Sequence, residues 1–329
     1  MIRFTSAIID VGRIDGVSGN WERILHRENT MVSYEEIQML TGIQACNYSA
    51  MGALAWTVHE MAIMIQREYE EMWLKPWSNL KLLFYFLRIV NLGSQIVSMV
   101  MSLRFAAGYK PTDRGCRMLI GFQGTTSAAL VFATQFILLL RVEALYYERT
   151  SLRYILRFLF LSEVILMTVI LGLSIPRIGY GIQCVALSFP YMVAVFFFTP
   201  IIFESVLFIL TMVKFYEAAR DGWGRESVLS RFLQDGLWAF ALPFSVLIVN
   251  AGCTMFLPGP KSSIAYPWMI AVPGFAGCRL ILNLSHLLKT TPPQHGLTSR
   301  ATGLIDTVIE TYQGSTGGER FLLILWLLC

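Results

Sequence analysis

The chain has 329 residues, of which 55% are hydrophobic and only 15% are charged. Soluble domains carry about 25% charged residues, so this composition excludes an ordinary soluble protein and predicts a multi-pass membrane protein whose main partner is the lipid bilayer. The net charge of +4 is small. Since membrane topology accounts for the basic residues, no nucleic-acid partner is predicted.

Seven apolar segments are long enough to cross ~30 Å of hydrocarbon as helices. In chain order they are about Gly42–Met64, Leu80–Leu103, Met118–Leu140, Tyr154–Ile175, Pro190–Val213, Gly236–Leu257 and Ala265–Leu288. The sequence therefore predicts an all-α integral membrane protein, a seven-transmembrane-helix bundle over residues 42–288. A polar N-terminal tail, residues 1–41, precedes it, and a C-terminal tail, residues 289–329, follows. Interior prolines are expected to kink the last three helices.

The third segment, Met118–Leu140, indicates the orientation, because it is uncharged and a basic cluster follows it. Loops on the side of that cluster, with the start of the C-terminal tail, hold eleven basic residues, and the opposite loops hold six. Basic residues concentrate on the cytoplasmic side. We therefore expect the N-terminus outside or in the lumen and the C-terminus in the cytoplasm, in the plasma membrane or the endoplasmic reticulum.

Two of the six cysteines fall on the outer side under this topology. Cys116 begins the third helix, and Cys184 lies in the loop between the fourth and fifth helices. A disulfide there would tie the loop over the mouth of the bundle. The alternative is two unpaired thiols, which is the state expected of Cys46, Cys253 and Cys278.

Ionisable residues near the cytoplasmic third of the bundle form a second candidate site. Charges in hydrocarbon are costly unless they pair across helices, and such pairs act either as static contacts or as a switch between two packings. The residues are Glu60, Arg88, Arg141, Glu143, Asp235 and Arg279.

Glu163 and Glu204 lie near the middle of two spans. A carboxyl group in hydrocarbon tends to keep its proton, so either residue, or Glu60, is a candidate acid catalyst for a lipophilic substrate; the alternative is a hydrogen bond to a neighbouring helix. His59 and His286 lack metal-binding spacing, and no phosphate-binding glycine loop or aspartate-rich motif is present. No metal and no cofactor are predicted.

Several short motifs carry a resemblance to a known family. They are Glu60, Glu68 with Trp73, Lys75-Pro-Trp77, Leu83-Phe84 to Arg88, Leu140-Arg-Val-Glu-Ala-Leu-Tyr146, Gln234-Asp-Gly-Leu237 and Arg279-Leu-Ile-Leu-Asn-Leu284. Over residues 36–288 the chain resembles an uncharacterised seven-transmembrane protein family of basidiomycete fungi whose N-terminal portion is a domain of unknown function. The family's usual Tyr-Asp reads His59-Glu60 here, and its Arg-Asp-Gly reads Gln234-Asp235-Gly236. The resemblance implies the fold and a fungal origin.

Two functions remain open at this point, and a third option is a scaffold with neither role. The layout favours a receptor-like membrane protein, similar in architecture to G-protein-coupled receptors, with a small lipophilic ligand and an unidentified cytoplasmic partner. The alternative is a membrane-embedded enzyme of a fungal biosynthetic pathway, acting on a lipophilic substrate by acid catalysis as a terpene cyclase does.

Overall fold

The computed structural model describes residues 34–74, 78–146, 149–181, 184, 186–188, 191–220 and 227–290. The chain divides into two units, residues 1–41 and residues 42–329. The described part of the first unit is the beginning of a helix, Tyr34–Thr41. The predicted C-terminal tail lies outside the described residues apart from Lys289 and Thr290.

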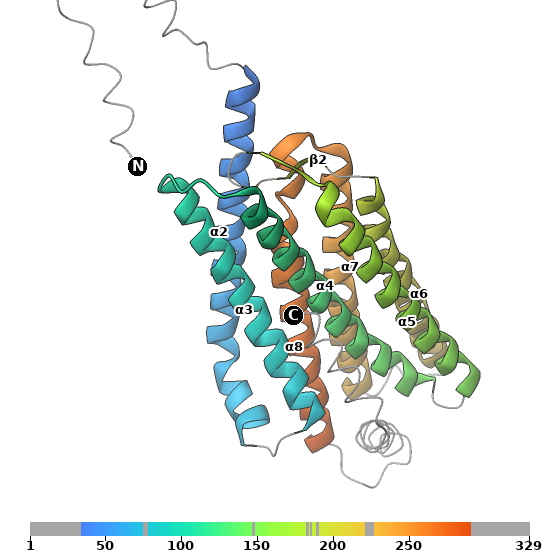
Figure 1. Cartoon of the computed structure of the whole chain (residues 1–329). Helices are drawn as coiled ribbons and strands as arrows, with labels where there is room; N and C mark the ends of the chain where they lie inside the picture. Colours follow the sequence, from blue (N-terminus) through green and yellow to red (C-terminus); the bar gives the residue numbers. More distant parts are fainter. Residues whose placement is uncertain are drawn as a thin grey trace, which may run out of the picture. The chain divides into compact units, whose positions relative to one another are not determined.

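In the described part of the chain, a long helix lies over most of each of the seven predicted segments, and Figure 1 shows how these helices are arranged. They are α2 (Tyr34–Glu68), α3 (Asn79–Ala106), α4 (Asp113–Leu145), α5 (Thr150–Ser174), α6 (Met192–Arg220), α7 (Ser227–Phe256) and α8 (Tyr266–Thr290). Short helical turns follow α2, α5 and α7: η1 (Tyr69–Trp73), η2 (Ile175–Arg177) and η5 (Gly259–Ser263). Within the described residues, six helical segments are long and apolar enough to cross a membrane, and α2 is not among them.

Most of these helices extend beyond the predicted apolar segments. Ser78 and Thr112 explain two of the extensions, because each hydroxyl accepts a hydrogen bond from a backbone N–H in the first turn of α3 or α4. Hydropathy measures only the part of a helix that lies in lipid, so it does not detect such capped ends. Of the interior prolines, Pro267 is the second residue of α8, where a proline interrupts no helical hydrogen bond. The proline inside α8 is Pro273, so the kink expected of this helix stays a prediction at that position.

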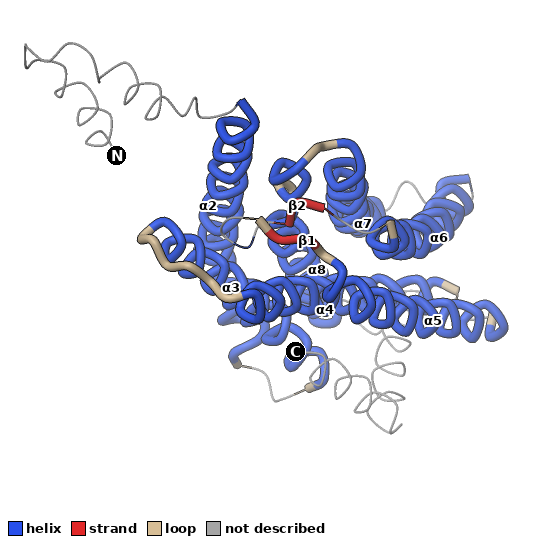
Figure 2. The backbone as a smooth tube through the Cα atoms, turned by 45° about the horizontal axis from the view of Figure 1, so that its top comes forward, coloured by secondary structure: helices blue, strands red, loops and turns tan. Residues whose placement is uncertain are grey.

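A short hairpin is the exception to the helical architecture in the described part of the chain. Strand β1 (Gly179–Tyr180) pairs antiparallel with β2 (Ala186–Ser188), with Gly179 opposite Ser188 and Tyr180 opposite Ala186. The hairpin connects α5 to α6 and contacts η5. Figure 2 shows it at the end of the bundle where α5 ends and α6 begins.

The core of the unit centres on α4. Ten consecutive residues of this helix, Thr126–Gln135, are all buried, so this middle part of α4 is enclosed on every side. It packs against α3, α5, α6 and α8, and α8 in turn packs against α3 and α7. The outer faces of the other helices carry many exposed large apolar side chains, among them Phe158, Ile165 and Ile202. A lipid-facing surface has this character.

Candidate functional site

A cavity of about 230 Å³ opens into one end of the bundle. It is lined by residues from all seven long helices, from η2 and η5, and by Cys184. The lining combines apolar side chains such as Phe105, Phe196 and Met269 with hydroxyl and amide groups. No charged side chain is present among the described residues that line it. Such a cavity suits an uncharged, largely apolar molecule with a few hydrogen-bonding groups.

Hydrogen bonds fix several of the polar groups around this cavity. Gln123 donates to the Ser98 hydroxyl at 3.2 Å, which links α4 to α3. The Tyr266 hydroxyl donates to the backbone carbonyl of Gln123 and links α8 to α4. Asn250 on α7 donates to the carbonyl of Ala265 at 3.0 Å. The cavity is therefore surrounded by helices that are bonded to one another, which limits how far its walls can move independently.

A disulfide lies at the same end of the bundle. Cys116, in the first turn of α4, is bonded to Cys184 in the α5–α6 connection, with their Cα atoms 5.1 Å apart. Phe105 and Tyr180 pack around the two buried cysteines. Cys184 has a φ of 56°, a left-handed conformation that is uncommon outside glycine. The disulfide fixes the hairpin connection to α4 beside the cavity, and Cys46, Cys253 and Cys278 are free.

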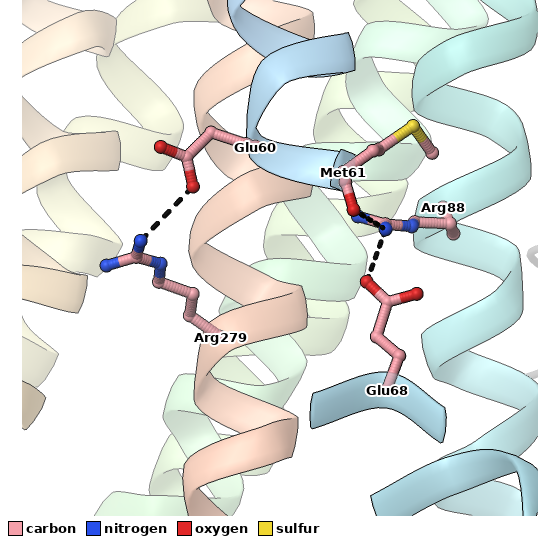
Figure 3. A network of polar contacts seen from close by, with 5 residues as sticks. All are labelled: Glu60, Met61, Glu68, Arg88 and Arg279. Carbon is pink, nitrogen blue, oxygen red and sulfur yellow. Dashed lines mark hydrogen bonds and ion pairs between the residues drawn. The ribbon is translucent and has the colours of Figure 1, made fainter. Parts of the chain in front are cut away.

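The predicted ring of charges is divided into separate pairs. Glu60 on α2 and Arg279 on α8 are paired at 3.1 Å (Figure 3). Arg88 on α3 is bonded to Glu68 and also donates to the carbonyl of Met61 at 3.3 Å. Glu68 was not among the predicted residues. It follows Glu60 by about two helical turns of α2.

A second group of contacts lies at the C-terminal end of α4, opposite the end that carries Cys116. The Arg141 guanidinium donates to the carbonyl of Leu280 on α8 at 3.1 Å. Glu143 accepts two hydrogen bonds of 2.7 Å from Arg157 on α5. The Tyr146 hydroxyl, whose pKa is raised by burial, donates to the carbonyl of Leu210 on α6 at 3.0 Å. The end of α4 is thus bonded to three neighbouring helices, and we call these three contacts the α4 clasp.

Arg157 was not predicted as the partner of Glu143. It follows Glu143 by fourteen residues and lies on the next helix, α5. The side chain of Asp235, the remaining predicted member of the ring, lies outside the described residues. On α6, the Lys214 ammonium donates a hydrogen bond to the exposed Glu217 carboxylate, which lowers the pKa of Glu217.

The three candidate acids do not line the large cavity. Glu60 lines a separate cavity of about 20 Å³, together with Arg88 and Arg279, which has room for about one water molecule. Glu163 on α5 and Glu204 on α6 are each 3% exposed and absent from the lining of both cavities. In the described part of the chain, no three His, Cys, Asp or Glu side chains are grouped as a metal site.

The fold and these sites together define an all-α, multi-pass membrane protein with a cavity at one end of its bundle. Residues 48–93 match the model of a family of unknown function, DUF6533. No curated protein and no solved structure matches the chain. The matched segment contains Glu60, Glu68 and Arg88, so it includes three of the four charged residues drawn in Figure 3.

Proposed function

We propose that this chain is a seven-helix, receptor-like membrane protein that binds a small uncharged lipophilic ligand in the 230 Å³ cavity. The absence of charge from the described lining carries the proposal. A cationic or anionic ligand in a low-dielectric site needs an opposite charge or a metal, and an uncharged ligand needs only shape and a few hydrogen bonds. The groups suited to this role include Gln95, Ser127 and Asn250.

The proposal includes α2 as the seventh membrane span. Its side-chain bonds to α8 and the segment before it support this assignment: Ser49 with Ile264 and Trp268, Glu60 with Arg279, and Arg67 with Asn283. Its exposed side chains include Met51, Val58 and Ile65. A helix with its ionic groups paired inward and apolar groups outward suits a lipid environment, although its overall composition is more polar than that of the other spans.

We place the cavity end on the outer or lumenal side and the α4 clasp on the cytoplasmic side, in the plasma membrane or the endoplasmic reticulum. Two features support this orientation. Disulfides persist in oxidising compartments, and the Cys116–Cys184 bond lies at the cavity end. The clasp end carries the basic residues Arg149, Arg153 and Arg157, which favour the cytoplasmic side.

Signalling would pass through α4. This helix contributes Gln123 and Ser127 to the cavity and Arg141 and Glu143 to the clasp. Because α4 is enclosed and packed, a ligand that displaces it at one end must also change its contacts at the other. A cytoplasmic partner that binds only one arrangement of the α4 clasp would then respond to ligand binding in the cavity.

The enzyme alternative is less well supported by the geometry. An acid catalyst must reach within hydrogen-bonding distance of its substrate. Glu163 and Glu204 do not line the large cavity, and the cavity beside Glu60 is too small for a substrate. We therefore assign no catalytic role to these acids.

The experiment compares two ligands with one carbon skeleton, an isoprenoid alcohol and the corresponding isoprenoid carboxylic acid. Each is added to the full chain in lipid nanodiscs, and the apparent melting temperature is measured. We expect the alcohol, or other uncharged members of a wider panel, to raise it by about 2–4 °C and the carboxylate to leave it unchanged. Stabilisation by carboxylates alone would contradict the proposal.

Two variants distinguish cavity binding from partition into lipid. Ser127→Phe places a ring at a buried position that lines the cavity and should abolish the stabilisation. Leu161→Phe adds a ring on the exposed face of α5 and should retain it. Equal stabilisation of both variants would show that the molecules act through the bilayer.

A further inference from the structure

Three buried polar side chains from three helices converge below the cavity. Gln135 on α4 is 0% exposed, and Glu163 on α5 and Glu204 on α6 are each 3% exposed. The Gln135 amide faces the Glu163 carboxyl, and Glu163 is in turn close enough to Glu204 to interact with it electrostatically. Helices α4, α5 and α6 all pack against one another. The two carboxyl groups are therefore close together in the interior of the bundle.

The positions of these residues along their helices agree with this convergence. Gln135 follows the deepest cavity residue of α4, Ser127, by eight positions. Glu163 precedes Leu171 on α5 by eight, and Glu204 follows Phe197 on α6 by seven. At ~1.5 Å per residue, each lies about 10–12 Å beyond the cavity. The cluster is therefore a separate site near the middle of the bundle.

The oxygen and nitrogen atoms of this cluster lack hydrogen bonds of ordinary geometry. They include both carboxyl oxygens of Glu163, one of Glu204, and both amide atoms of Gln135. Buried polar groups in proteins are nearly always bonded. By contrast, the buried Glu143 carboxyl is satisfied by Arg157, and Glu60 is paired with Arg279. The Gln135, Glu163 and Glu204 side chains thus present a set of oxygen ligands with no basic side chain bonded to them.

We propose that Gln135, Glu163 and Glu204 form a binding site for a single sodium ion in the core of the bundle. Carboxylate and amide oxygens are the ligands that hard cations prefer. With one carboxyl ionised and the other protonated, one monovalent ion neutralises the site, which removes the cost of an isolated charge in hydrocarbon. Divalent ions require more ligands or retained water than these three side chains supply.

The surroundings of the site favour a small, fully dehydrated ion. Phe160, one turn from Glu163, is in ring contact with Phe203 at 5.7 Å and Phe136 at 6.2 Å. Met167 and Leu207, on the same two helices as the acids, are 0% exposed. These apolar groups separate the site from both ends of the bundle. Because the ion would bridge α4, α5 and α6, its binding should hold these helices together.

The test measures the apparent melting temperature of the full chain in nanodiscs containing sodium chloride, potassium chloride or choline chloride at equal ionic strength. We expect sodium to raise the melting temperature by about 2–4 °C over choline, with a smaller effect of potassium. Glu163→Gln and Glu204→Gln should each remove the sodium-dependent rise. Each replaces a buried carboxyl group by an uncharged amide of nearly the same shape, so loss of folding is not expected to obscure the result.

Two controls make the result specific. Glu60→Gln alters another buried acid, one that is paired with Arg279, and should keep the sodium response. Ser127→Phe, which fills the cavity, should also keep it, so failure of the sodium site and failure of the proposed ligand site are distinguishable. Direct binding of radioactive sodium should be lost in Glu204→Gln. No sodium response in the unaltered chain, a response to calcium instead, or a response that persists in both glutamine variants would overturn the proposal.

Discussion

At the scale of single residues, the two members of the Glu143–Arg157 ion pair differ in their exposure to solvent. The side chain of Glu143 is 0% exposed, and that of its partner Arg157 is 40% exposed. An arginine at this position can extend its head group toward water if its partner is removed, because its long apolar stem remains packed. A buried glutamate has no such alternative. The two halves of the pair should therefore respond unequally to substitution.

We predict that Arg157→Ala destabilises the protein by about 3 kcal/mol, because it leaves the Glu143 carboxylate buried and unpaired. Glu143→Ala should cost less, and the double variant should be more stable than Arg157→Ala alone. The measurement is equilibrium unfolding in mixed micelles. Glu217→Gln, which breaks the more exposed pair Lys214–Glu217, is the control and should leave the free energy of unfolding almost unchanged. Equal costs for Arg157→Ala and Glu143→Ala would contradict the explanation.

At the scale of elements, α8 packs closely against α3 and α4 through small residues. A Cβ atom at Gly274 would lie 2.7 Å from Cγ and 2.9 Å from Cβ of Asn91 on α3. A Cβ atom at Gly277 would lie 2.7 Å from a methyl group of Leu87. Glycine lets helix backbones approach in membranes, where there is no hydrophobic force between helices. The Thr134 hydroxyl adds a bond of 2.9 Å from α4 to the carbonyl of Pro273.

We predict that Gly274→Ala destabilises the protein by about 1–3 kcal/mol, because the base of the Asn91 side chain must move. The matched control is Gly172→Ala on α5, where no atom lies within 4 Å of the added Cβ. Alanine is the better helix former by about 1 kcal/mol, so this control should be neutral or stabilising. Thermal unfolding of the two variants in one detergent gives the comparison. A stable Gly274→Ala protein would show that α3 and α8 are less closely packed.

The elements also show what sequence reasoning can predict. The helices were found because long apolar runs in lipid have few alternatives to helix. The β1–β2 hairpin was missed, because strands of two and three residues are too short to show a period. The cavity was missed for a different reason. Its lining is spread over all seven long helices and consists of ordinary apolar, serine and amide residues, so nothing in the sequence marks them as one site.

The residues of the charged pairs were predicted from the sequence only in part. The cost of burying charge singled out Glu60 and Arg279, which are paired. The same reasoning could not select Glu68 for Arg88, because choosing a partner depends on which helices are neighbours. The isolated acids Glu163 and Glu204 were recognised as unusual from their depth in the apolar segments. Gln135 was not, since the reasoning selected ionisable side chains and a neutral amide is not one of them.

At the scale of the whole molecule, two independent features distinguish the ends of the bundle. The disulfide between Cys116 and Cys184 lies at one end, where oxidation is required. Arg149 and Arg153 lie at the other, beyond the last turn of α4. The first feature is covalent chemistry and the second is the charge bias of membrane insertion. Their agreement makes the orientation of the chain open to a direct test.

We predict the sidedness of three introduced cysteines in a chain whose Cys46, Cys253, Cys278 and Cys329 are replaced by alanine. Lys110→Cys, between α3 and α4, should react with a membrane-impermeant maleimide in intact cells, or in lumen-exposed microsomes if the chain stays in the endoplasmic reticulum. Arg149→Cys should react only from the cytoplasmic side. Ile37→Cys, near the start of α2, should behave like Lys110→Cys, because a spanning α2 places its start opposite its end. Reaction of Ile37→Cys only from the cytoplasmic side would mean that α2 does not span the membrane, since six spans without it would leave both ends of α2 in one compartment.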